Sequence, residues 1–315
     1  MSVALATPAA GRMCPADYLY APSVFDRDPE IETEVLYVVG GLYGNLAALE
    51  AVERLAAAES GPTAMVFNGD FHWFDAEPEW FAKIDRAVAR HTALRGNVET
   101  EIARRNDIGA GCGCAYPPSV ADEIVSRSNE ILHELRGTVL PEAKARLGQL
   151  PTNIVAQVGP LRVGIVHGDS ASLAGWRFAH DALDDQRFRA WLNDVRRASR
   201  IDIFASTHTC LAALRDFALP AGRLTIINNG AAGMPNFSAS TFGVMTRIAT
   251  TRAPHRTLYG LARDGVRIDA LALHYDHRAF CEHFLARWPE GSPAHAAYWS
   301  RIADGPDYPM ARAVA

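Results

Sequence analysis

The sequence predicts an α/β fold, because apolar runs typical of strands alternate with helical patterns along the chain. An apolar run at 35–39 precedes a helical pattern that begins at Leu46, and a second apolar run follows at 64–67. This order of strand, helix and strand is typical of a βαβ unit. After Pro151 the pattern changes to short apolar runs separated by turns, which indicates further strands.

The composition is that of a globular protein with a substantial core. The chain has 315 residues, 49% of them hydrophobic, which favours one large domain or one domain with an extension. The net charge of -5 and the scattered lysines and arginines do not favour nucleic acid as a partner. We expect no membrane segment and no secretory leader, and the five cysteines do not suit a secreted disulfide framework. The expected location is therefore a reducing cytoplasm.

The βαβ unit places a polar loop after each of its two strands. The glycine-rich loop 40–45 follows the first strand, where glycines let the backbone pass close to a ligand and Asn45 can cap the helix. Asp70 follows the second strand, where a buried carboxylate is costly unless it binds a cation or is hydrogen-bonded. Sites in open α/β sheets are built at this edge.

The remaining elements can be assigned in chain order. Residues 80–90 indicate a helix and 92–94 a short strand, and the loop 105–118 leads to another helix. Ser119 and Asp122 resemble a capping box that would begin it. A further amphipathic helix is expected at 188–195, and further strands at 153–158, 161–166, 201–205, 224–227, 243–248 and 266–273.

The chain divides into three parts by the texture of its sequence. Residues 1–33 have no clear period and are expected to form an extended arm, 34–282 the main domain, and 283–315 a largely helical extension packed on it. Three aromatic residues are candidates for packing the arm on the body: Tyr18, Tyr20 and Phe25.

Four predicted strands are each followed by a polar residue that can bind a metal. These residues are Asp70, Asn97, His167 and His208, and each lies beside glycine or another small residue. One such residue alone is more often a satisfied core or surface group than a ligand, but four in one chain favour a site. Oxygen and imidazole ligands together suit Mn, Fe or Zn.

The order and spacing of these segments resemble the calcineurin-like metallophosphoesterases, and among them the small prokaryotic phosphodiesterase-type branch. The matching segments are GLYGN at 41–45, GD at 69–70, GNVE at 96–99, HG at 167–168, THTC at 207–210 and NNGAAGMPN at 228–236. The resemblance implies a four-layer sandwich of two mixed β-sheets flanked by helices. It also implies metal-dependent hydrolysis of a phosphate ester.

The resemblance further implies which metal ligands the chain has kept. Family members hold two metals that share a bridging aspartate, which corresponds to Asp70. The other ligands of the second metal correspond to Asn97, His167 and His208, and all are present. A former site that no longer binds metal is less expected than a working one. Random loss of ligands would affect both metal sites, whereas here every loss falls on one of them.

The resemblance also implies which groups are lost. The ligands that bind only the first metal in the family correspond to Gly41, Tyr43 and Cys210. The catalytic acid of the family corresponds to Val98, which cannot transfer a proton. The chain is therefore expected to bind one metal ion instead of two.

Nearby side chains are candidates for compensation. Three residues are candidate auxiliary groups at the catalytic site: Cys210, His72 and Tyr43. His72 lies in an aromatic stretch and can instead be a packed core residue, and Tyr43 can instead fill the space of the missing first metal. Cys112 and Cys114 can join Cys210 in a thiolate-rich centre, or can be small buried hydrophobes.

Three functions follow from these observations. The first is a phosphoesterase-type hydrolase that uses one divalent or trivalent ion (Fe, Mn or Zn) and its bound water on a small phosphorylated substrate. The second is a mononuclear Fe or Zn enzyme with thiol-assisted or redox chemistry on the same scaffold. The third is a non-catalytic binding or regulatory protein, favoured by the lost ligands and by Val98.

Overall fold

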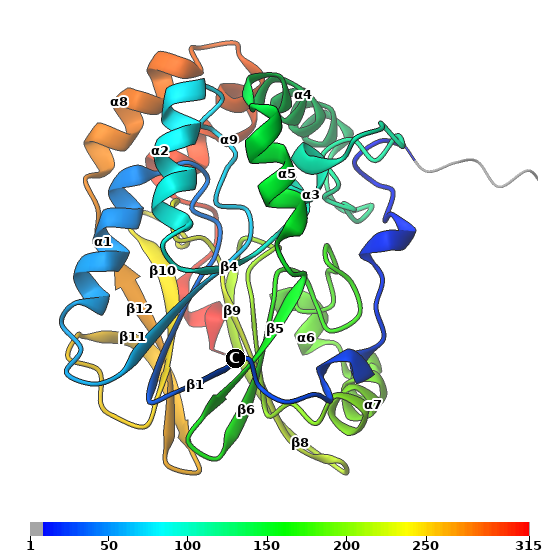
Figure 1. Ribbon diagram of the computed structural model, residues 1–315, viewed down its shortest axis with the longest axis vertical. Helices are drawn as coiled ribbons and strands as arrows, with labels where there is room; N and C mark the ends of the chain where they lie inside the picture. Colours follow the sequence, from blue (N-terminus) through cyan, green and yellow to red (C-terminus); the bar gives the residue numbers. More distant parts are fainter. Residues whose placement is uncertain (1–8, 315) are drawn as a thin grey trace, which may run out of the picture.

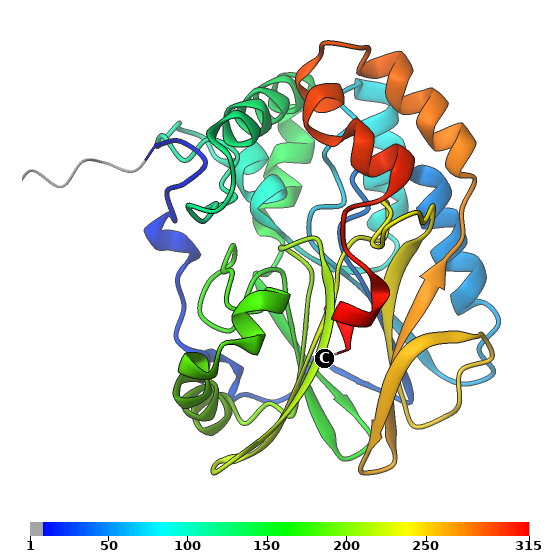
Figure 2. The same cartoon turned by 180° about the vertical axis from the view of Figure 1, so that it is seen from behind.

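Two six-stranded sheets pack face to face with helices on both outer sides, in a computed structural model that describes residues 9–314. Figure 1 and the reverse view in Figure 2 show the layers. Apolar side chains from both sheets form the core between them, including Leu36 and Val38 from one sheet and Ile165 and Ile203 from the other. The predicted four-layer sandwich of mixed sheets is confirmed.

The first sheet contains the predicted βαβ unit. Its order is β11-β12-β10-β2-β3-β4, with β2, β3 and β4 parallel and the other neighbours antiparallel. The strands are β2 (Val35–Val39), β3 (Thr63–Asn68), β4 (Thr92–Leu94), β10 (Gly243–Ala249), β11 (Thr257–Arg263) and β12 (Val266–Leu273). The carboxyl ends of β2, β3 and β4 therefore meet at one edge.

The second sheet has the order β1-β5-β6-β7-β9-β8. Its strands are β1 (Ile31–Thr33), β5 (Asn153–Val158), β6 (Leu161–Val166), β7 (Ile203–Ser206), β8 (Ala212–Leu219) and β9 (Gly222–Asn229). The predicted hairpin is β5 and β6, which pair antiparallel. The end of the N-terminal arm joins this sheet, because β1 pairs in parallel with β5. Tyr18 and Phe25 of the arm are buried against the body.

Helices cover the outer faces of both sheets. The first sheet packs against α1 (Leu46–Ala56), α2 (Pro78–Val88), α3 (Asn97–Ala103), α4 (Asp122–Thr138), α5 (Pro141–Gln149), α8 (His277–Arg287) and α9 (Pro293–Asp304) through one large core. The second sheet packs against α6 (His180–Asp184) and α7 (Arg189–Ser199), with short 3-10 helices at Ala16–Tyr18, Pro22–Phe25, Gln186–Phe188 and Met310–Ala313 elsewhere. Among residues 9–314, no helix is both long and apolar enough to cross a membrane.

Two helix starts test the capping predictions. The side chain of Asn45 accepts a hydrogen bond from the backbone N–H of Ala48, so the predicted cap of α1 is confirmed. The predicted capping box at Ser119 is wrong. Helix α4 begins at Asp122 after Ala121, which has no side-chain cap, and the preceding residues form a turn in which the Val120 N–H donates to the Pro117 carbonyl.

Candidate metal centre

Four polar side chains from four segments meet where the carboxyl ends of the two sheets come together. Asp70 follows β3, Asn97 begins α3, His167 follows β6 and His208 follows β7, and all four are buried. His167 Nε2 lies 3.0 Å from Asn97 Oδ1, 3.0 Å from His208 Nδ1 and 3.3 Å from Asp70 Oδ2. The ligand atoms of the aspartate and the two histidines lie within 4.8 Å of one another, so they can all reach one ion.

The outward-facing atoms of these ligands are held by backbone carbonyls. His167 Nδ1 lies 2.9 Å from the carbonyl oxygen of Asn68. His208 Nε2 and the Asn97 Nδ2 group each lie 3.0 Å from a carbonyl oxygen in the loop 112–114. A carbonyl can only accept, so each of these nitrogens donates, and the remaining ring nitrogens and the Asn97 oxygen face the centre with lone pairs. Converging lone pairs beside a carboxylate repel one another unless a cation lies between them, and this donor set fits a metal ion.

The pKa shifts of the two histidines run in opposite directions, and that of His208 agrees with this arrangement. Burial lowers the pKa of His167, but the Asp70 carboxylate raises it more, and the net shift is upward. Burial and the neighbouring His167 together lower the pKa of His208 to about 3. His208 is therefore neutral near pH 7, as a metal ligand must be.

Asp70 is held by a buried glutamate, Glu99, which was not predicted as a site residue. Glu99 Oε2 accepts hydrogen bonds from the backbone N–H groups of Asp70 and Gly96, each at 2.8 Å. The Val98 N–H donates to Asp70 Oδ1 at 3.1 Å. The signal was present as a glutamate three residues after Gly96, because a glutamate there can accept a hydrogen bond from the backbone N–H of the residue before the helix. Glu99 therefore fixes the backbone at Asp70, which has a φ of 53°.

A cavity of about 210 Å³ lies over three of the four candidate ligands, Asp70, Asn97 and His208. Its walls are mostly aromatic or aliphatic, with one cationic side chain, Arg301. The lining residues are Tyr43, Asp70, Trp73, Asn97, Val98, Cys114, Tyr116, Val120, Ile124, Trp176, His208, Thr209, Cys210, Tyr298 and Arg301. We call this space the metal cavity.

Residues 35–228, more than half of the chain, match the family model described as calcineurin-like phosphoesterase. The chain belongs to the calcineurin-like phosphoesterase family. It is similar to the crystal structure of a metallophosphoesterase from Sphaerobacter thermophilus, with 16% identity, a TM-score of 0.55 and coverage of 87% of this chain and 100% of that one. It is also similar to that of a hypothetical protein from Pyrococcus horikoshii OT3, with 16% identity, a TM-score of 0.58 and coverage of 87% and 99%. These likenesses show the fold. The search of curated proteins found no match.

In this phosphoesterase, the three residues at the positions that the resemblance assigns to the first metal lie together. Tyr43 Oη lies 2.8 Å from Cys210 Sγ. A Cβ atom at Gly41 would lie only 2.6 Å from the Tyr43 ring, so the ring fills the space that an aspartate side chain there would need. Burial raises the pKa of the Tyr43 hydroxyl and that of the Cys210 thiol, so both stay protonated near pH 7.

The cysteines do not assemble a second centre in the part of the chain that the structure describes. The group of three or more metal-ligating residues found there consists of Asp70, His167 and His208 and contains no cysteine. Cys112 is fully buried, and its carbonyl supports Asn97. Burial raises the pKa of the Cys114 thiol far above its usual range. The hypothesis of a thiolate-rich centre therefore gains no support.

His72 is fully buried and is not among the residues that line the metal cavity. Its Nδ1 contacts the Asp75 carboxylate, and its ring stacks on Phe81 with the centroids 3.7 Å apart. Its Nε2 atom is buried without a hydrogen-bond partner. These contacts favour the packed, hydrogen-bonded role over a catalytic one.

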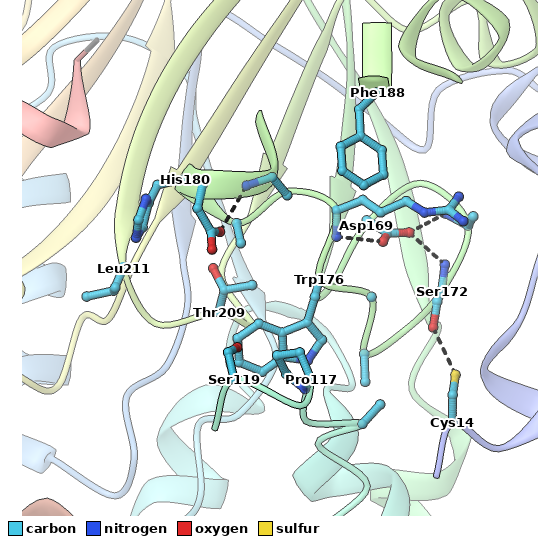
Figure 3. A pocket seen from close by; sticks show the side chains of 18 of the residues that line it. Cys14, Pro117, Ser119, Asp169, Ser172, Trp176, His180, Phe188, Thr209 and Leu211 are labelled. Carbon is cyan, nitrogen blue, oxygen red and sulfur yellow. Dashed lines mark hydrogen bonds between the residues drawn. The ribbon is translucent and has the colours of Figure 1, made fainter. Parts of the chain in front are cut away.

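A larger cavity of about 560 Å³ adjoins the metal cavity and shares Trp176 and Thr209 with it. Figure 3 shows this second cavity, with both shared residues among those that line it. Trp176 Nε1 donates to the carbonyl of Cys114 at 2.9 Å, the same oxygen that His208 Nε2 contacts. Trp176 is therefore a fixed wall between the two cavities.

Proposed function

We propose that this calcineurin-like phosphoesterase is a hydrolase that works with a single metal ion held by Asp70, Asn97, His167 and His208. The observation that supports it most is the orientation of the donors, since every outward N–H is bound to a carbonyl and the lone pairs converge. The mixture of carboxylate, amide and imidazole suits Mn, Fe or Zn.

A metal ion bound there supplies a Lewis acid for the phosphoryl group and an acidified water as the nucleophile. The protonated Tyr43 hydroxyl and Cys210 thiol line the metal cavity and share one hydrogen bond, so at most one proton of the pair is free to be donated to a bound phosphate. Val98 cannot donate a proton to the leaving group, so turnover is slow for esters with poor leaving groups.

The substrate that suits the metal cavity is a small phosphorylated molecule with an apolar or aromatic group. Trp73, Tyr116, Trp176 and Tyr298 give its walls broad apolar faces, which pack against such a group. The volume of about 210 Å³ suits a small molecule better than a polymer.

We also propose roles for the two terminal parts of the chain. The extension 283–315 completes the metal cavity of the main domain 34–282, because it supplies Tyr298 and Arg301. The arm 1–33 supports the second cavity through Cys14 and Leu19. All five cysteines are free, and this favours a reducing cytoplasm.

The experiment is metal analysis of the purified chain, together with hydrolysis of para-nitrophenyl phosphate and its diester. One ion per chain and slow hydrolysis are expected. His208→Ala should lose the ion and the activity, whereas Cys210→Ser and the exposed His133→Ala should keep the ion. Iron with thiolate absorption and no hydrolysis would favour the redox alternative. Purified chain that binds no added metal would favour a non-catalytic protein and would sink the proposal.

A further inference from the structure

Arg301 is a cation without a carboxylate partner at the metal cavity. Its Nη2 atom donates to the carbonyl oxygens of Cys210 at 2.6 Å and Pro235 at 3.3 Å. Its Nε atom is buried without a hydrogen-bond partner. Among residues 9–314, no aspartate or glutamate lies within ion-pair distance of this guanidinium.

Arg301 is half-buried, and fully buried arginines elsewhere show how this chain treats such a charge. Arg215 pairs with Asp184 and Arg247 pairs with Glu59, at 2.7 and 2.6 Å. A cation removed from water without a counter-charge is costly, so pairing is the rule. Arg95 and Arg162 also bond mainly to carbonyls, but neither of them lines the metal cavity.

The position of Arg301 relates it to the lost first metal. It binds the carbonyl of Cys210, whose thiol contacts the Tyr43 hydroxyl. Both residues stand at family positions for ligands of the missing ion. A fixed positive charge therefore lies beside the place where a second cation would neutralise a phosphate.

We propose that Arg301 binds the anionic group of the substrate and takes over the electrostatic role of the first metal. The substrate is then an oxyanion of the phosphate type, held between the guanidinium and the ion site. A guanidinium suits this task because its N–H groups match two oxygens of a phosphate. The inference rests on the proposed function for the ion, but the anion site is testable without it.

The test is titration calorimetry of the full chain with inorganic phosphate, with Mn²⁺ bound and without metal. Arg301→Gln should weaken phosphate binding about tenfold or more in both states, because hydrogen bonds to a charged group are strong. Arg301→Lys should retain part of the affinity. The matched control is Arg278→Gln, on an exposed arginine of α8, and should bind as the wild type does.

A structural role for Arg301 predicts a different result. Arg301→Gln would then lower the melting temperature but leave the phosphate affinity unchanged, and that outcome would overturn the inference. Absence of phosphate binding by the wild type in both states would overturn it as well. Phosphate binding that depends on Arg301 in a chain that binds no metal would support the inference while the single-metal proposal failed.

A second measurement needs no variant and so does not depend on folding of Arg301→Gln. Phenylglyoxal labels accessible arginines of the native chain, and peptide mass spectrometry reads each site. Inorganic phosphate should protect Arg301 but not Arg278. Equal labelling of Arg301 with and without phosphate would count against the anion site.

Discussion

The hydroxyl oxygen of Tyr43 lies 2.8 Å from the sulfur of Cys210, at two positions that the resemblance assigns to ligands of a first metal. The Tyr43 ring occupies the space over Gly41, and the Cys210 thiol also contacts the carbonyl of His208 at 3.4 Å. The two groups form a neutral hydrogen-bonded pair in the wall of the metal cavity. Under the proposed function, this pair stands in place of a first ion, next to the four proposed ligands of the other.

Restoring the lost ligands should depend on removing the tyrosine. Gly41→Asp alone should destabilise the fold by about 2 kcal/mol, because residue 41 has a positive φ and the new side chain meets the Tyr43 ring. Adding Tyr43→His and Cys210→His should recover part of that loss in the presence of Mn²⁺ and bind a second ion. Urea unfolding and metal analysis measure both effects. A triple variant that still binds one ion would show that these three ligands alone do not restore a first metal site.

Glu99 should act on the metal through the backbone of Asp70. Glu99→Gln leaves one accepting oxygen where the carboxylate presents two to the backbone N–H groups of Asp70, Gly96 and His72, so a loss of about 2 kcal/mol in unfolding free energy is expected. The affinity for Mn²⁺ should fall about tenfold or more, as is usual for groups that support ligands. Glu123→Gln, on an exposed position of α4, is the control. Unchanged Mn²⁺ affinity in a folded Glu99→Gln chain would remove this positioning role.

Trp176 should set the size of substrate that the enzyme accepts. Trp176→Ala opens the metal cavity to the larger one, so the kcat/KM ratio for naphthyl phosphate over para-nitrophenyl phosphate should rise about tenfold. Trp176→Phe keeps most of the wall and should leave the ratio near that of the wild type. Phe188→Ala, which changes only the second cavity, should do the same. A ratio that does not change in Trp176→Ala would place the leaving group elsewhere.

A buried ion pair far from the cavity predicts a pH dependence of stability. Burial raises the pKa of Glu59, but hydrogen bonds from Arg247 and Tyr37 lower it more, so its pKa in the folded chain lies below the usual 4.5. The stabilisation is complete above pH 4.5 and is lost as the pH falls through the folded pKa. Glu59→Gln should cost about 3 kcal/mol at pH 7, because it leaves Arg247 without its partner. This cost should shrink below pH 4.5 in urea unfolding, and a constant cost would exclude ionic pairing as its cause.

The positions of the four proposed ligands can be predicted from the sequence because each one follows an apolar run typical of a strand. A strand end places its next residue at the sheet edge, so Asp70, His167 and His208 could be assigned without knowledge of the packing. Asn97 could be assigned too, since it follows β4 by three positions. The edge strands were harder. The strand β8 was missed because Arg215 and Asp216 interrupt its apolar run, although Arg215 is buried in a pair with Asp184.

Residues that complete the site from a distance gave no local signal. Arg301 lies on α9, and only the packing of the C-terminal extension brings it to Cys210. Trp176 lies in an irregular segment after β6, where no periodicity marks its direction. The predicted cap at Ser119 failed because the pattern of residue types does not record the turn before α4. Tertiary contacts decide such positions, and a single sequence does not display them.

We propose that this chain binds one ion where the resemblance implies two. Anomalous diffraction from crystals grown with excess Mn²⁺ counts and locates the ions directly. We expect one peak per chain, within about 2.0–2.3 Å of Asp70, Asn97, His167 and His208. A second peak beside Tyr43 and Cys210, or a single peak that these four residues do not ligate, would contradict it.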